Sequence, residues 1–218
     1  MLKLYLSLSS ILLLTGCSIS KYNHLTCEKV GIHVQAIKPV VSSTTVSKYN
    51  TSIDILKNHL TGILVVKQTD SITTRLVFVT ELGMKMFDFE AKRGEMNAVY
   101  VFEPLNKPKL IEVLKRNFSN MFLLNRNYST SLYSCSNKHF SKIMYDKRGK
   151  EKWYYSGMNT GSTVLNLSLQ ETFLKRKRAS KIEYTYNSDT QSYSQIKCKQ
   201  YGLIKFYFEL TEIQKAND

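Results

Sequence analysis

Apolar and polar positions alternate in short runs along most of the chain after residue 46, and this pattern is typical of β-strands. In residues 72–82 the alternation places Leu76 and Phe78 on one face and Arg75 on the other. The strand signals cover residues 52–56, 60–67, 72–82, 84–90, 96–103, 132–135, 140–145, 153–156, 162–169, 181–186, 195–200 and 203–212. Turn residues separate these runs, so we expect roughly ten antiparallel strands in a sheet that curls into a barrel or part of one.

One segment, residues 107–124, has a helical period instead. Asn106 is placed to cap it, and Pro108 suits its first turn. Apolar residues recur at every third or fourth position: Leu110, Leu114, Phe118, Met121 and Phe122. Such an amphipathic helix must bury its apolar stripe, and the curved sheet is the surface available.

The first sixteen residues have the three parts of an export signal. Lys3 supplies the positive charge, residues 4–14 supply the apolar segment, and Thr15 and Gly16 form the cleavage site. As a helix the apolar segment would rise only about 16 Å, which is too short to cross a hydrocarbon layer of about 30 Å. We therefore predict that residues 1–16 are removed.

The junction Leu14-Thr15-Gly16-Cys17 resembles the lipobox of bacterial lipoproteins. The resemblance implies a diacylglycerol on the Cys17 sulfur, palmitate or similar chains, and cleavage just before that residue. Residues 18–21 carry no acid, which by analogy with the enterobacterial sorting rule favours the periplasm-facing leaflet of the outer membrane. The predicted organisation is a signal peptide at 1–16, a lipidated N-terminus and tether at 17–48, and a single domain at 49–218.

The chain is strongly basic, with a formal charge of +14 that falls to +13 when Lys3 leaves with the signal. The export signal excludes nucleic acid as the acidic partner. Anionic lipid headgroups or lipopolysaccharide phosphates remain, and a merely solvated surface is the alternative. The densest basic run reads as a solvated turn between two strands, and contact with anionic headgroups is the alternative. The candidates for that contact are Lys175, Arg176, Lys177 and Arg178.

Three cysteines remain besides the lipidated one: Cys27, Cys135 and Cys198. In an oxidising compartment they allow one disulfide and one free thiol, and the sequence leaves the pairing open. Their spacing fits no zinc site, and buried apolar thiols are an equal alternative.

No catalytic signature is present: there is no G-x-S-x-G, H-E-x-x-H, phosphate-binding glycine loop or C-x-x-C pair. The four histidines are scattered singly. Asp88 lies between Phe87 and Phe89, so alternation places it on the opposite face, where we expect it to meet solvent. The sequence therefore predicts a protein that is not an enzyme and has neither cofactor nor metal.

Three stretches resemble lipoproteins typical of Bacteroidota. The layout of those lipoproteins is similar to that of the LolA/LolB-like superfamily of lipoprotein-localisation carriers and receptors. The three stretches are Thr61-Gly62-Ile63-Leu64-Val65-Val66, the segment from Glu81 through Glu90, and the closing strands from Ile196 to Lys205. The resemblance spans residues 50–212. It implies an antiparallel half-barrel with a helix on its concave side and an apolar cavity for acyl chains. One departure is that the sequence assigns no counterpart to the exposed apolar loop residue of the receptor type.

The predicted function is that of a non-enzymatic, outer-membrane lipoprotein that binds a lipid or acyl-bearing ligand on its concave side. The alternative is a structural or assembly lipoprotein that docks an envelope protein through its sheet edge or its basic face. The candidate cavity residues are apolar positions expected to face inward: Ile63, Val65, Leu76, Phe78, Phe87, Phe89, Leu114, Phe118, Phe122, Phe206 and Phe208.

Overall fold

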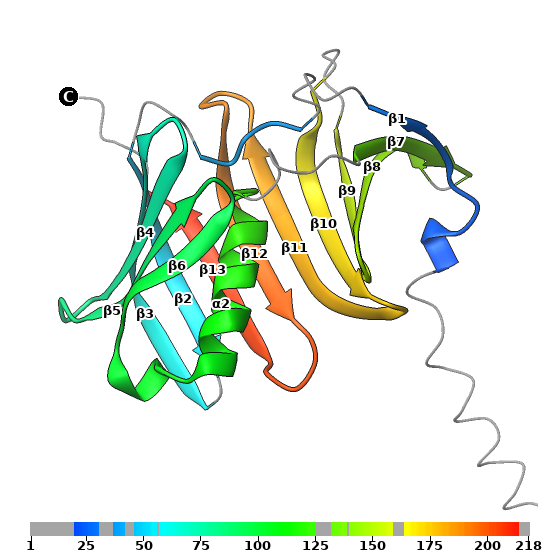
Figure 1. The fold of residues 1–218 in the computed structure, drawn as a ribbon. Helices are drawn as coiled ribbons and strands as arrows, with labels where there is room; N and C mark the ends of the chain where they lie inside the picture. Colours follow the sequence, from blue (N-terminus) through cyan, green and yellow to red (C-terminus); the bar gives the residue numbers. More distant parts are fainter. Residues whose placement is uncertain are drawn as a thin grey trace, which may run out of the picture.

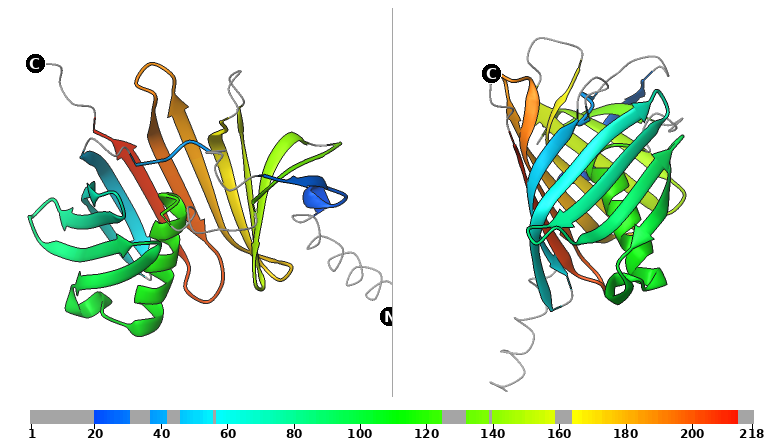
Figure 2. Two further views of the ribbon diagram at one scale, coloured as in Figure 1. Left: turned by 45° about the horizontal axis from the view of Figure 1, so that its top comes forward. Right: turned by 90° about the vertical axis from the view of Figure 1, so that its left-hand side faces the viewer.

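The protein is built around one curved antiparallel sheet whose two edge strands do not meet (Figures 1 and 2). The computed structural model describes residues 20–30, 37–41, 46–55, 57–124, 132–138, 140–158 and 164–213. Over these residues the sheet has thirteen strands, in the order β1-β7-β8-β9-β10-β11-β12-β13-β2-β3-β4-β5-β6. This open sheet confirms the predicted half-barrel, with more strands than the sequence signals suggested.

Neighbours along most of the sheet are also neighbours in sequence, because short turns connect them. The strands are β1 (Thr26–Lys29), β2 (Ser47–Ile55), β3 (Asn58–Asp70), β4 (Thr73–Thr80), β5 (Lys85–Lys92), β6 (Glu95–Val101), β7 (Leu132–Asn137), β8 (Phe140–Arg148), β9 (Glu151–Met158), β10 (Asn166–Leu174), β11 (Lys177–Asn187), β12 (Ser192–Gln200) and β13 (Phe206–Glu212). The helices are η2 (Ser20–Tyr22), η3 (Glu103–Leu105) and α2 (Pro108–Met121).

Helix α2 lies on the concave side of the sheet, as predicted (Figures 1 and 2). Its stripe of buried side chains includes Leu110, Leu114 and Phe118. The predicted cap is wrong: Lys107, in an extended conformation, precedes the helix and makes no side-chain cap, and Pro108 occupies the first turn. The helix is therefore stabilised mainly by the burial of its apolar stripe on the sheet.

Two described stretches of the N-terminal segment, residues 20–30 and 37–41, pack against the sheet. Strand β1 pairs with β7, and Cys27 forms a disulfide with Cys135 opposite it. Ile37 and Val40 are buried in the main core. The disulfide closes a loop of 108 residues, for which chain entropy predicts about 4–5 kcal/mol of stabilisation. Cys198 is the free, buried thiol.

Two glycines allow neighbouring strands to approach closely. A Cβ atom on Gly62 of β3 would lie 2.1 Å from the carbonyl oxygen of Val79. A Cβ atom on Gly157 of β9 would lie 1.7 Å from the carbonyl oxygen of Asn166, beside the register shift between β9 and β10. Both positions therefore require glycine for its lack of a side chain.

The predicted inward face of β3 is wrong. Leu64 and Val66 are fully buried on the concave side, whereas Ile63 is 42% exposed and Val65 is half-buried. All four residues are apolar, so alternation within this run gives no signal for which face is inward. Pairing decides it, because Leu64 lies opposite Phe78 of β4.

Candidate functional site

The concave face beneath α2 is filled by aromatic side chains. Phe118 of the helix lies 5.1 Å from Phe87 and 5.0 Å from Phe208, measured between ring centroids. Nine of the eleven candidate cavity residues are buried in this core: Leu76, Phe78, Phe87, Phe89, Leu114, Phe118, Phe122, Phe206 and Phe208. A ligand that binds beneath α2 would therefore have to displace the helix from the sheet.

A polar contact joins the middle of α2 to strand β12 within this apolar core. The side-chain amide of Asn117 donates to Gln200 Oε1 at 3.0 Å and to the carbonyl oxygen of Val113 at 2.8 Å. The thiol of Cys198 donates to Asn117 Oδ1 at 3.7 Å. Burial raises the pKa of Cys198, so the thiol remains protonated. These contacts fix the position of the helix along β12.

The C-terminal end of α2 has buried amide groups that lack partners. The Tyr184 hydroxyl lies 3.0 Å from the carbonyl oxygen of Met121 and 3.2 Å from Gln170 Oε1. It has one hydrogen and cannot donate fully to both oxygens. Within the described part of the chain, the amide nitrogens of Gln170 and Asn120 have no hydrogen-bond partner, and both residues are at least 95% buried. A group that accepts hydrogen bonds would satisfy them.

A second buried cluster lies on the convex side, at the N-terminal segment. The carboxylate of Glu171 in β10 is fully buried, and it pairs with Lys21 Nζ at 2.5 Å and Arg178 Nη2 at 2.8 Å. Tyr22 donates its hydroxyl hydrogen to the same carboxylate. The Tyr22 ring stacks on Tyr154 with centroids 3.9 Å apart. Burial, and then the hydrogen bond with Glu171, raise the pKa of Tyr22 well above its usual value.

We call these four residues, Lys21, Tyr22, Glu171 and Arg178, the Glu171 clamp. Asn137 of β7 adds to it, because its side chain donates to the carbonyl oxygen of Lys21 at 2.9 Å. Sequence reasoning missed the clamp, since a charged residue inside an irregular run of polar and apolar positions gives no signal of burial. The clamp holds the chain a few residues after Cys17 against the sheet.

The clamp changes the interpretation of the basic run between β10 and β11. Arg178 is half-buried and bound to Glu171, and its guanidinium also lies 5.8 Å from the Tyr201 ring centroid. Lys175 and Arg176 are exposed in the turn, and Lys177 is exposed at the start of β11. Only these three of the four predicted headgroup contacts are therefore free of the clamp.

Asp88 is buried, which corrects the prediction that it meets solvent. It lies on the convex face, as alternation predicts, but it is only 2% exposed. Arg75 covers it with two hydrogen bonds, at 2.9 and 2.8 Å, and Lys85 lies 3.8 Å away. The hydrogen bond to Asp88 raises the pKa of Arg75. This arrangement is an ion pair between neighbouring strands.

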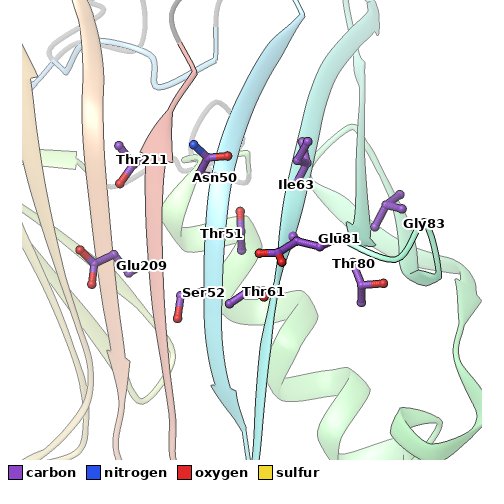
Figure 3. Close-up of a pocket in the computed structure, with 12 residues that line it drawn as sticks. Asn50, Thr51, Ser52, Thr61, Ile63, Thr80, Glu81, Gly83, Glu209 and Thr211 are labelled. Atoms are coloured by element: carbon purple, nitrogen blue, oxygen red, sulfur yellow. The ribbon is translucent and has the colours of Figure 1, made fainter.

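The convex face carries an open hollow over strands β13, β2, β3 and β4 (Figure 3). Most of the residues that line it have polar side chains, and the set comprises Asn50, Thr51, Ser52, Thr61, Gly62, Ile63, Val79, Thr80, Glu81, Gly83, Glu209 and Thr211. Glu209 already accepts from Gln195 at 2.9 Å and pairs with Lys197 at 3.2 Å. The hollow is thus an open surface in which the carboxylate of Glu209 already has partners.

Two leucines are almost fully exposed at the tips of turns. Leu82 lies between β4 and β5 and is 92% exposed, and Leu203 lies between β12 and β13 and is completely exposed. Leu82 is an exposed apolar loop residue near the start of the domain, a feature that the sequence did not assign.

Among the described residues, no three histidine, cysteine, aspartate or glutamate side chains gather in a way that could bind a metal. Over the same residues, no helix has both the length and the apolar character needed to cross a membrane. Cys17, the predicted lipidation site, lies outside the described residues.

Comparison with known proteins gives a match in structure alone. No family model matches the sequence, and no curated protein matches it significantly. The structure is similar to a LolA superfamily protein from Nitrosomonas europaea, with a TM-score of 0.46 and 10% sequence identity. The match covers 82% of this chain and 89% of that one.

Proposed function

We propose that the protein is a non-enzymatic lipoprotein, anchored through Cys17 in the periplasm-facing leaflet of the outer membrane, that binds a lipid or acyl-bearing ligand between α2 and the concave face. The observation that carries the proposal is the composition of this face. An aromatic and aliphatic wall lies under a single helix, and buried amides without acceptors lie at the end of that helix.

The chemistry of an acyl-bearing ligand fits both parts of this surface. Its chain would replace the apolar stripe of α2 on the wall and gain roughly 25 cal/mol for each Å² of apolar area that it buries. Its ester or amide carbonyl would accept from the unpartnered nitrogens of Asn120 and Gln170. A purely apolar ligand would leave these nitrogens unsatisfied.

Displacement of α2 is the step that this function requires. Only one helix has to move, because among the described residues α2 alone covers this part of the sheet (Figure 1). Each buried polar group without a partner weakens the packing of α2 on the sheet by about 1–3 kcal/mol. A ligand that satisfies them recovers this free energy. Binding and helix movement are therefore coupled in the proposal.

The free thiol of Cys198 offers a direct test. An Asn117→Cys variant places a second thiol at the γ position of residue 117, one bond short of Oδ1, which lies 3.7 Å from the Cys198 sulfur. We expect oxidation to link α2 to β12 through these two thiols. We expect the linked form, verified by mass, to bind a fluorescent fatty acid at least about tenfold more weakly than its reduced form.

Wild-type protein taken through the same oxidation and reduction is the control for the native disulfide. Its affinity for the fatty acid should stay unchanged. Equal binding by the linked and reduced variant would contradict entry beneath α2, and no binding by wild-type protein would contradict the lipid-binding function itself.

The anchor is tested separately by Cys17→Ala. Because acyl chains on the sulfur hold the protein on the bilayer, we expect the wild-type protein in the outer-membrane fraction and the variant in the soluble periplasm. Mass spectrometry of the N-terminal peptide should identify the diacylglycerol on Cys17. A variant that stays with the membrane would refute lipid anchoring as the means of attachment.

The edge strand β6 favours a second function, the docking of an envelope protein. Val99 and Tyr100 on this strand are 55% and 41% exposed, and an edge strand can pair with a strand from another chain. Mass spectrometry of protein purified from its native membrane separates the two functions. Stoichiometric lipid supports carriage, whereas an empty protein with a stable partner supports assembly.

A further inference from the structure

Neighbouring hairpin turns gather positive charge at one end of the sheet. The turns β8–β9 and β10–β11 lie side by side, since the amide of Lys175 donates to the carbonyl oxygen of Lys150 at 3.1 Å (Figure 1). Residues 147–152 and 174–178 together contain eight basic side chains and one acidic one. We call this pair of turns the basic end. Its exposed cations are Lys147, Lys150, Lys175, Arg176 and Lys177, which make it a compact positive surface.

The fully exposed Leu203 lies next to the basic end. Its turn, β12–β13, is joined to β11 by a hydrogen bond from the amide of Tyr201 to the carbonyl oxygen of Ala179, at 2.9 Å. The Tyr201 ring is covered by two cations: its centroid lies 5.8 Å from Arg178 Cζ and 5.7 Å from Lys199 Nζ. An apolar side chain bordered by cations is suited to the interface between lipid headgroups and acyl chains.

The Glu171 clamp brings the start of the mature chain to this same end. Glu171 binds Lys21 and Tyr22 from the N-terminal segment, and it binds Arg178 at the base of the β10–β11 turn. Cys17 precedes Lys21 by four residues, which reach at most about 14 Å. A lipid on Cys17 would therefore hold the basic end within a short distance of the bilayer.

We propose that the basic end and Leu203 form a docking face for an anionic phospholipid bilayer. Lys150, Lys175, Arg176 and Lys177 contact phosphate groups, and Leu203 inserts into the interface. The inference rests on the proposed lipid anchor, which gives the face its orientation. The docked sheet then stands with a fixed end toward the membrane instead of turning freely about its anchor.

The test uses the mature chain with Cys17→Ala, which lacks acyl chains, so that docking is measured without the anchor. Vesicles of phosphatidylcholine, with and without phosphatidylglycerol, are sedimented with the protein. We expect binding only to the phosphatidylglycerol vesicles, weakening as salt is raised. Replacing Lys175, Arg176 and Lys177 by alanine should lower the partition coefficient about a hundredfold, since each cation near an anionic surface contributes about fivefold.

Two matched variants at the opposite end are the controls. The charge control combines Lys92→Ala, Arg93→Ala and Lys138→Ala, which remove the same charge from exposed positions at the turns β5–β6 and β7–β8.

The apolar contact is tested by Leu203→Ser, which should weaken binding to the vesicles on the order of tenfold. Its control is Met158→Ser at the β9–β10 turn, where a 66% exposed residue is changed and binding should stay the same.

Equal losses in the two charge variants would show that net charge alone binds the vesicles, and the docking face would be abandoned. Failure of the parent protein to bind phosphatidylglycerol vesicles would also overturn it. Neither result bears on the lipid anchor, which is tested separately by the fractionation of Cys17→Ala and by the mass of the N-terminal peptide.

Discussion

Replacing both Lys21 and Arg178 by methionine is expected to lower the free energy of unfolding by about 3–5 kcal/mol. The change leaves the fully buried carboxylate of Glu171 with the Tyr22 hydroxyl but without either cation. Methionine preserves much of the aliphatic volume, so the loss reports the unpaired charge. Denaturant unfolding followed by the fluorescence of Trp153, the single tryptophan, measures it.

Adding Glu171→Gln to this double variant is the control. The glutamine carries no charge and still accepts from Tyr22, so we expect a recovery of about 1–2 kcal/mol. If the free energy of unfolding of the double variant fell by less than about 1 kcal/mol, water would have access to the carboxylate of Glu171 and the clamp would not be buried in solution. The N-terminal segment would then be free to leave the sheet.

The replacement Phe118→Ala is expected to cost a similar amount, about 3–5 kcal/mol. Phe118 is fully buried between α2 and the sheet, and its ring contacts those of Phe87, Phe89 and Phe208. Truncation removes these contacts and leaves a cavity that the rigid sheet can close only in part. Thermal or denaturant unfolding of the purified mature chain gives the value.

Tyr100→Ala is the matched aromatic control, because Tyr100 is 41% exposed on the edge strand β6 and should cost less than about 1 kcal/mol. If Phe118→Ala were equally mild, α2 would not be packed on the concave face in solution, and the face would already be open to ligand. A large loss means that binding must compete with a well-packed helix, as the proposed function requires.

The two buried clusters lie in different halves of the sheet and stabilise different parts of the protein. The aromatic core beneath α2 stabilises one half of the concave face and contains the proposed ligand surface. The Glu171 clamp and the disulfide between Cys27 and Cys135 attach the N-terminal segment to the other half, on the convex side. The proposed anchor and the proposed ligand surface therefore use different side chains.

The faces of strands were predictable wherever apolar and polar residues alternate. Phe206 and Phe208 lie in the core as expected, and so do Leu76 and Phe78, because a side-chain period of two is a local property of the strand. The run 63–66 is apolar throughout, and there only the pairing with Phe78 and Tyr49 settled which residues face inward. A one-residue shift exchanges the two faces.

The sequence by itself determined an amphipathic helix near residues 108–121 and a chain of antiparallel strands. The lipobox at Cys17 stays a prediction from the sequence. Each is a pattern within a few adjacent residues. Only the tertiary structure decided that Cys27 pairs with Cys135, that Asp88 is covered by Arg75, and that Glu171 is buried. The disulfide and the contact of Tyr22 with Glu171 join residues more than 100 positions apart in sequence. The pair of Arg75 and Asp88 depends on the register between the adjacent strands β4 and β5.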